Sequence, residues 1–246
     1  MRPHFDRPLA GVIFDLGGTL IYPVRGVAEE VCAAHLESWL RAEGWPVEVG
    51  PAIRDARTWL FEMTRKTGRQ FTMHEAIRRA AQQLGRQAPD AQFVHRAERA
   101  FYEPELADYR AFPDALPLLR RLRAARLRLA CISNTSSDWI IQQIVDRMGF
   151  GPLFDQVVSS AAYGRVKPDP GIFRTILSRW GISPGRVAMV GDTLLADVAG
   201  GRGVGMRTVC VTMTPNPDNV NHPLINADAD AATLTEAEQI LFRWMS

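Results

Sequence analysis

The stretch VIFDLGGTL, Val12 to Leu20, runs from apolar residues into a single aspartate and then into two glycines. An apolar run that stops at a carboxylate is typical of a buried strand ending at a polar site. Gly17 and Gly18 would let the backbone turn sharply, so that its amides can approach a ligand closely. The stretch therefore predicts a strand that delivers Asp15 to a functional edge.

Four further apolar runs have the length and composition of strands in a parallel sheet that is covered on both faces. They are Leu127 to Asn134, Gln156 to Ser159, Arg186 to Asp192 and Arg207 to Thr212. Helical patterns lie between the later runs, over Ser137 to Met148, Pro170 to Trp180 and Leu194 to Gly201. This alternation predicts an α/β fold with a doubly wound parallel sheet, built from residues 1–20 and 112–246.

The segment between these two parts, residues 21–111, shows helical patterns only. They cover Val27 to Ala42, Ala52 to Lys66, Thr72 to Leu84 and Pro89 to Tyr102. Thr72 and Glu75 have the spacing of a capping box, which fixes the start of the third helix. We therefore expect an all-helical domain inserted after the first strand of the α/β core.

The composition excludes several classes of protein. The net charge of +2 over 246 residues, with scattered basic side chains, gives no reason to expect a nucleic-acid partner. No apolar run approaches the roughly 18 residues of a membrane span, and no secretory signal is present, so we expect a cytoplasmic protein without a membrane partner. Three distant cysteines in apolar surroundings, Cys32, Cys131 and Cys210, are expected to be buried free thiols.

Polar residues follow the predicted strands at their carboxyl ends, where ligands bind in such sheets. Asp15 ends the first strand, Ser133 and Asn134 end the second, and Asp192 ends the fourth. Each alone has an ordinary explanation as a turn or a helix cap. Lys167 joins them from a loop that continues through Pro168 and Pro170, and it is one of only two lysines among 29 basic residues. Because the chain otherwise uses arginine, this lysine is expected to fill a role that arginine cannot.

Taken together, four motifs resemble the haloacid dehalogenase (HAD) superfamily with a helical cap after its first motif. They are FDLGGTL, CISNTS, VKPDP and VGDTLLAD, which contain Asp15, Ser133, Lys167 and Asp192 with Asp197. The last motif is most similar to the phosphatase and nucleotidase branches. The resemblance implies a hydrolase that dephosphorylates a small phosphorylated metabolite through an aspartyl-phosphate on Asp15.

The resemblance also implies a role for each motif residue. Mg²⁺ would be held by Asp15, the carbonyl of Gly17 and Asp192, with Asp197 behind them holding a metal-bound water or Lys167. Lys167 would neutralise charge in the transition state. The phosphate would be bound by Leu16, Gly17, Thr19, Ser133 and Asn134.

One position departs from the family pattern. HAD phosphatases usually carry a second aspartate two residues after the nucleophile, as a general acid and base, and here that residue is Gly17. A phosphatase could borrow a proton carrier from elsewhere, with the cap histidines His35, His74 and His95 as candidates.

Three other possibilities stay open. A dehalogenase also lacks the second aspartate, although it needs no metal and would not require Asp192 and Asp197. A phosphonatase would need a cap lysine, for which Lys66 is the candidate. A weak or inactive relative would act as a binding protein. The oligomeric state stays open as well.

Overall fold

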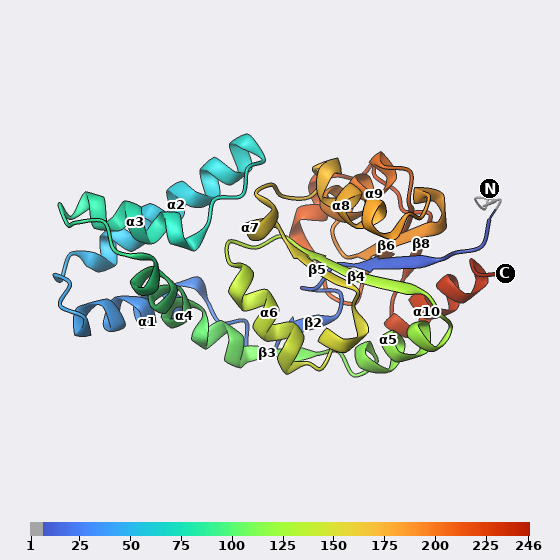
Figure 1. The fold of residues 1–246 in the computed structure, drawn as a ribbon, viewed down its shortest axis with the longest axis horizontal. Coiled ribbons are helices and arrows are strands. Elements are labelled where there is room, and N and C mark those ends of the chain that lie inside the picture. Colours follow the sequence, from blue (N-terminus) through green and yellow to red (C-terminus); the bar gives the residue numbers. More distant parts are fainter. Residues whose placement is uncertain (1–6) are drawn as a thin grey trace.

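The computed structural model describes residues 7–246 and contains a six-stranded parallel sheet in the order β5-β4-β1-β6-β7-β8 (Figure 1). The strands are β1 (Gly11–Phe14), β4 (Arg128–Ser133), β5 (Gln156–Ser159), β6 (Val187–Gly191), β7 (Arg207–Val211) and β8 (Ala229–Ala231). The α/β fold and the five predicted strands are confirmed. The edge strand β8 was not predicted, because three residues centred on Asp230 give no apolar run.

Helices cover both faces of the sheet, as the apolar character of both sides of β1 requires. Val12 and Phe14 face one hydrophobic cluster, which includes residues of α5 (Ala115–Ala124), α6 (Asp138–Arg147) and α10 (Leu234–Arg243). Ile13 faces the opposite cluster, formed mainly with α8 (Pro170–Trp180). In Figure 1, α8 and α9 (Gly200–Gly203) lie above the sheet, and α5, α6 and α10 lie below it. The shorter elements are α7 (Ser160–Tyr163), a π-helical turn Leu194–Ala199, and 3₁₀ turns Gly151–Leu153, Pro184–Arg186 and Pro217–Asn221.

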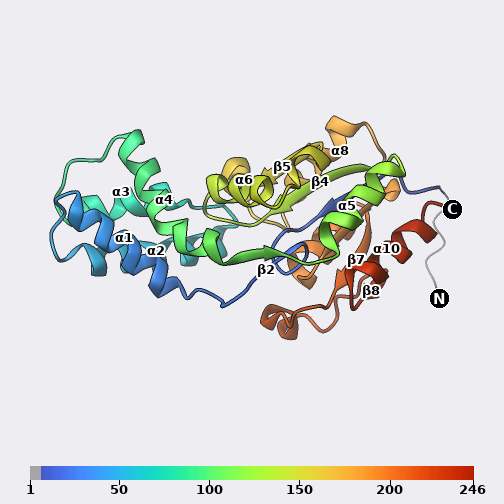
Figure 2. The ribbon, with the colours of Figure 1, turned by 90° about the horizontal axis from the view of Figure 1, so that it is seen from below.

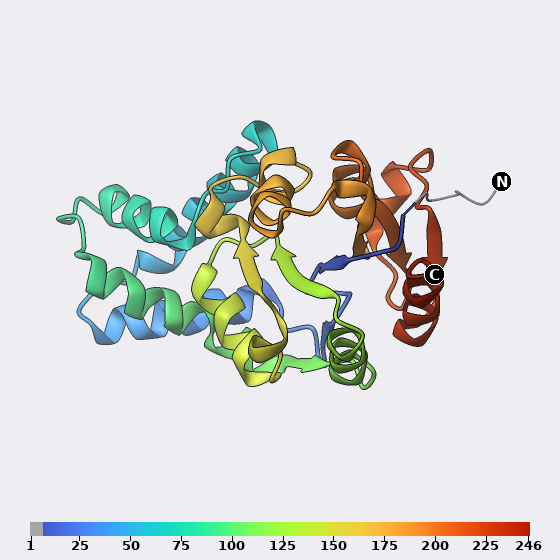
Figure 3. The same cartoon turned by 45° about the vertical axis from the view of Figure 1, so that its right-hand side comes forward.

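Four helices form the insert between β1 and β4. They are α1 (Glu29–Ala42), α2 (Val49–Thr67), α3 (Met73–Gln83) and α4 (Ala91–Asp108). Leu36, Ile53, Ile77 and Val94, one from each helix, are completely buried. The predicted capping box is present, because the Thr72 side chain accepts from the Glu75 amide and Glu75 accepts from the Thr72 amide. Figures 2 and 3 show the insert at one end of the molecule and α10 at the other.

The expectation of helices only in residues 21–111 was wrong at both ends of the segment. β2 (Ile21–Pro23) and β3 (Tyr109–Ala111) pair as an antiparallel ribbon that connects the insert to the core. The Asp108 carboxylate strengthens this connection by accepting from the amides of Arg25 (3.1 Å) and Gly26 (3.0 Å). The two crossings between core and insert are therefore held side by side.

Helix α4 also extends beyond its predicted end. The predicted helix stopped at Tyr102, two residues before Pro104, and proline lacks an amide donor and crowds the preceding turn. In the structure α4 continues through Pro104 to Asp108. The additional turn carries Glu105 toward the core.

A second contact joins the insert to the core through the α2–α3 loop. The backbone amide of Gln70 donates to the Gly164 carbonyl (2.9 Å), and the backbone amide of Met73 donates to the Ser136 carbonyl (2.9 Å). Ser160 Oγ donates to Gln70 Oε1 at 2.7 Å in a buried position. The insert thus contacts core loops after β4 and β5 as well as the ribbon. Among the described residues, no helix is both long and apolar enough to cross a membrane.

Candidate active site

The site lies where the chain order of the sheet changes direction. β1 is central, with β4 and β5 on one side and β6, β7 and β8 on the other. At such a point the carboxyl ends of neighbouring strands open a crevice. A cavity of about 300 Å³ is found here. Its lining includes Asp15, Leu16, Gly17, Ser133, Asn134, Lys167 and Asp192, which were predicted, and also Thr193, Asn216, Glu105 and Tyr109.

Lys167 is fixed at the centre of this site. Its side chain is 2% exposed, and Nζ donates to Asp15 Oδ1 (2.6 Å), Asp197 Oδ1 (2.6 Å) and the Ile132 carbonyl (3.0 Å). An ammonium has three donors, so all of them are used. The Asn134 side chain clamps the lysine backbone, accepting from the Lys167 amide (2.8 Å) and donating to its carbonyl (3.1 Å).

Three buried carboxylates lie close together at this site, and two of them, Asp15 and Asp197, bind the ammonium. One oxygen from each of Asp15, Asp192 and Asp197 lies within 4.8 Å of the others. Burial raises the pKa of Asp15 from 3.8 to about 7, and the neighbouring carboxylates add to this rise while Lys167 opposes it. Burial opposes the charged form of Lys167, but Asp15 and Asp197 together raise its pKa. The lysine is therefore charged, and the site holds more carboxylates than one ammonium can neutralise.

Such a site suits a hard cation. The surplus carboxylates supply oxygen ligands, which Mg²⁺ prefers over nitrogen or sulfur. The exposed residue Gly17 borders the same cavity. Asp15 and Asp192 could therefore hold a magnesium ion, with Gly17 beside them on the cavity wall.

The loop after β1 needs only one of its two glycines for its conformation. Gly18 has φ +70°, and a Cβ there would lie 2.6 Å from Asp192 Oδ2. At Gly17 a Cβ would meet no atom within 4 Å, and the backbone is not left-handed. The expectation that both glycines serve the sharp turn is thus corrected. Gly18 allows the loop to approach Asp192, whereas Gly17 has room for a side chain.

Several hydrogen-bond donors point to a ligand at this loop. The backbone amides of Leu16, Gly17 and Asn134 donate to no protein group within residues 7–246, and the Ser133 hydroxyl has no partner there. Leu16 and Ser133 are buried, where donors are normally satisfied, whereas Gly17 and Asn134 are exposed at the cavity. Four of the five predicted phosphate-binding residues therefore present free donors at the cavity.

Thr19, the fifth, lies elsewhere. Its side chain is completely buried and does not line the cavity. Its hydroxyl lies 3.5 Å from Asp15 Oδ2, a long hydrogen bond. Thr19 is therefore placed to orient the Asp15 carboxylate and not to contact a ligand directly.

Two asparagines that the sequence analysis did not select support Asp192. Asn216 Nδ2 donates to Asp192 Oδ2 (2.8 Å), and Asn219 Nδ2 donates to the Asp192 carbonyl (2.8 Å). Both belong to the segment NPDN, where asparagine and proline are ordinary turn residues. Only the fold shows that this turn approaches β6.

Glu105 and Tyr109 enter the cavity from the insert. The Tyr109 hydroxyl donates to Glu105 Oε1 at 3.1 Å. Burial raises the pKa of Glu105, although Tyr109 and Arg57 act in the opposite direction. Glu105 is thus a carboxyl group that holds a proton more readily than an exposed glutamate.

The side chains proposed from sequence for the missing acid or for a Schiff base lie outside this cavity. His74 and His95 line a different cavity, and His35 Nδ1 contacts the Ala100 carbonyl at 2.6 Å. Lys66 is exposed near the end of α2. None of the four borders the cavity that contains Asp15.

Comparison with known proteins agrees with this geometry. Residues 9–205 match the model of the haloacid dehalogenase-like hydrolase family. The chain is 27% identical over 201 residues to a glyceraldehyde 3-phosphate phosphatase of Methanopyrus kandleri, covering 82% of this chain and 83% of that protein. It is 26% identical over 245 residues to a phosphoglycolate phosphatase of Nitrosospira multiformis, covering 97% and 98% of the two chains.

A solved structure shares the fold. The 2-haloacid dehalogenase from Pseudomonas syringae pv. Tomato DC3000 superposes with a TM-score of 0.69 at 24% identity, covering 96% of this chain and 99% of that one. The family match spans both parts of the α/β core and the insert between them, and it includes the four motifs that converge on Lys167. The chain therefore belongs to the haloacid dehalogenase-like hydrolases.

Proposed function

We propose that the protein is a magnesium-dependent phosphatase that acts on a small phosphorylated metabolite through a phosphorylated Asp15. The contact that carries this proposal is the 2.6 Å ion pair of Asp15 with Lys167, beside free donors that face one cavity. A carboxylate with this surrounding can attack phosphorus and expel an alcohol, and water can then release phosphate. The phosphatase names of relatives over most of their length support this reaction.

In this reaction the free donors would bind the phosphoryl oxygens. The amides of Leu16, Gly17 and Asn134 and the Ser133 hydroxyl can donate to them, while Lys167 offsets the charge that develops. Thr19 and Asp197 would hold Asp15 and Lys167 in place. Mg²⁺, held by Asp15, Gly17 and Asp192, would offset the repulsion between the carboxylate and the phosphate.

We infer that Glu105 replaces the acid that is absent at Gly17. It borders the same cavity, and its raised pKa favours the protonated form that can donate to a leaving alcohol. Tyr109 would orient it through the 3.1 Å hydrogen bond. The insert would then act as a cap, residues 21–111, that contributes a catalytic group to the core of residues 1–20 and 112–246.

The cavity favours a substrate whose remainder carries no second negative charge. Lys167 is the single cationic side chain among the described residues that line it, and it is already paired with Asp15 and Asp197. The lining residues that the structure describes therefore offer no free cation to a carboxylate on the substrate, and Ile140, Ile141 and Ile144 add apolar surface from α6. Phosphates of neutral polyols, aldehydes or sugars fit these surroundings better than phosphorylated acids.

A phosphate-release assay tests the function. The panel contains glycerol, sugar and glyceraldehyde phosphates, phosphoglycolate, phosphoserine, a phosphonate and a 2-haloacid, each with and without Mg²⁺. We expect release of phosphate from neutral-tail phosphates in Mg²⁺ only, and loss of release in Asp15→Asn. Halide release without metal would identify a dehalogenase, and no turnover of any compound would favour a binding protein.

Magnesium binding should also stabilise the protein. Since Asp15, Asp192 and Asp197 are crowded like charges, a cation between them relieves repulsion in the folded state only. We expect saturating Mg²⁺ to raise the melting temperature, measured by differential scanning calorimetry. Asp192→Ala should remove this increase, and an unchanged increase in the variant would contradict the assigned ligands.

A further inference from the structure

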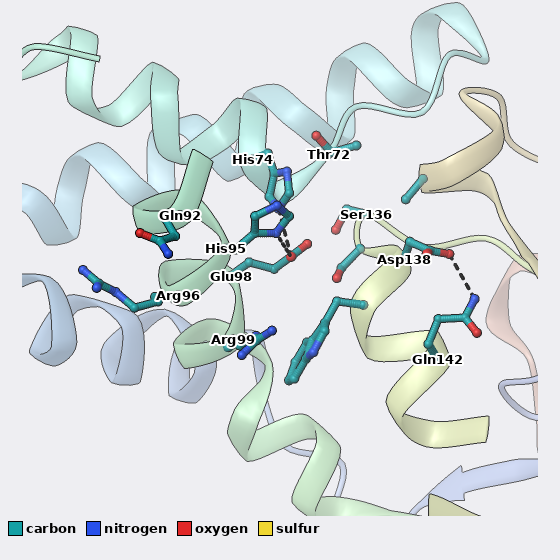
Figure 4. Close-up of a pocket in the computed structure, with 13 residues that line it drawn as sticks. Thr72, His74, Gln92, His95, Arg96, Glu98, Arg99, Ser136, Asp138 and Gln142 are labelled. Atoms are coloured by element: carbon teal, nitrogen blue, oxygen red, sulfur yellow. Dashed lines mark hydrogen bonds and ion pairs between the residues drawn. The ribbon is translucent and has the colours of Figure 1, made fainter. Parts of the chain in front are cut away.

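A second and larger cavity, about 730 Å³, lies between the insert and the core (Figure 4). Residues of α3 and α4 line one side, and residues at the start of α6 line the other. The segment Asn134–Ser137 separates it from the catalytic cavity, because Asn134 and Thr135 border one cavity and Ser136 and Ser137 border the other. Nothing in the phosphatase mechanism uses this second cavity.

Two histidines and a glutamate meet at its wall. His74 lies in the first turn of α3, and His95 and Glu98 lie one turn apart on α4. In Figure 4 the two rings and the carboxylate converge. His74 Nε2 is 2.9 Å from Glu98 Oε2, and His95 Nδ1 is 3.8 Å from the same oxygen. The ring centroids are 4.6 Å apart.

These separations suit coordination of one metal ion. The three ligand atoms lie within 4.8 Å of one another. Ligands about 2.0 Å from a tetrahedral zinc ion are about 3.3 Å apart, which lies between the two measured distances. The His95 side chain is 58% exposed, so its ring can turn toward the ion without disturbing the packed helices.

The buried negative charge of Glu98 also favours a bound metal ion. The Glu98 side chain is 4% exposed, and a buried carboxylate is costly without a charged partner. Within residues 7–246, its partners are the two histidines, and no arginine or lysine pairs with it. Arg96 and Arg99 line the same cavity, but Arg96 pairs with Glu43 and Arg99 lies over the Trp139 ring. A divalent ion held by these three side chains would neutralise Glu98.

We propose that His74, His95 and Glu98 form a binding site for a late first-row transition metal ion of the zinc class. Two imidazoles and one carboxylate select such ions over Mg²⁺, which prefers oxygen ligands throughout. The three ligands leave a coordination position toward the cavity, as in zinc sites that bind a further small ligand. The site is distinct from the all-oxygen cluster at Asp15, so the two sites select different ions.

Zinc titration of the full-length, untagged protein tests the proposal. Saturating Mg²⁺ is included to occupy the carboxylates around Asp15, and binding is measured calorimetrically. We expect one Zn²⁺ per chain, and Co²⁺ at the same site should give the visible absorption of a tetrahedral ion. Loss of a group behind a ligand commonly weakens a site about 10–100-fold, so His95→Ala should weaken Zn²⁺ binding by about 100-fold or more.

Two comparisons make the outcome decisive. His35→Ala removes a histidine of the same insert that contacts the Ala100 carbonyl instead, and it should leave Zn²⁺ binding unchanged. Glu98→Gln keeps the size of the buried side chain and should weaken Zn²⁺ binding at least as strongly. His95 is exposed, so His95→Ala is the variant that disturbs folding least. Equal Zn²⁺ affinity in wild type and His95→Ala, or no Zn²⁺ uptake by the wild type, overturns the proposal.

Discussion

Replacing Lys167 by arginine should reduce kcat/KM for any accepted phosphate by about 10²–10³-fold, the usual cost of losing one preorganised charge-stabilising donor. The lysine is enclosed, because Nζ contacts Asp15, Asp197 and the Ile132 carbonyl in a position that is 3% exposed. A guanidinium is planar and larger, so it cannot place donors on these three acceptors from the same backbone position. Charge alone would be preserved in this variant.

The chain supplies a matched control for this experiment. Lys66 is the only other lysine and lies exposed near the end of α2, away from the catalytic cavity. Lys66→Arg should keep wild-type kcat/KM. Near wild-type turnover in Lys167→Arg would mean that the site requires only a positive charge. Loss of activity in Lys66→Arg would instead revive a catalytic role for the insert lysine.

The convergence at Lys167 was predictable because it follows from strand order. Polar residues directly after buried parallel strands must meet at one edge, so short runs around Asp15, Ser133 and Asp192 were sufficient. Groups held by irregular segments were not predictable in this way. Asn216 reaches Asp192 from a turn whose composition is that of any exposed turn.

Glu105 was hidden for a different reason. The predicted helix stopped at Tyr102, and Pro104 is an ordinary signal for the end of a helix, so Glu105 lay outside it. Packing of α4 against α1 and against the core holds the helix through the proline. Likewise, sequence alone gave both glycines of the first motif the same role, whereas the backbone requires glycine only at Gly18.

The proposed role of Glu105 makes the leaving group the decisive variable. If Glu105 donates a proton, Glu105→Gln should lower kcat/KM for alkyl phosphates by about 10²–10⁴-fold, the usual contribution of a general acid. An aryl phosphate such as 4-nitrophenyl phosphate releases a stable anion and should be affected far less. kcat/KM is the right quantity, since it reports the transfer to Asp15 and not the later hydrolysis of the phosphorylated enzyme.

The matched control lies on the same helix. Glu103 is 73% exposed and faces His35, so Glu103→Gln should change neither substrate class. A wild-type enzyme that already prefers aryl phosphates steeply, with no change in Glu105→Gln, would show that the missing acid has no replacement. An equal loss for both classes would mean that Glu105 positions other groups and transfers no proton.

Restoring the family's aspartate should rescue the defect. A Cβ at Gly17 meets no atom within 4 Å, and the backbone there is not left-handed, so an aspartate can be accommodated. Gly17→Asp in the Glu105→Gln background should therefore recover much of the alkyl phosphate activity while leaving the aryl activity nearly unchanged. Such a selective recovery would mean that the carboxyl group introduced at position 17 performs the proton transfer that Glu105 performs in the wild type, from a different side of the cavity. Failure of the rescue, together with intact folding and Mg²⁺ binding, would contradict that equivalence.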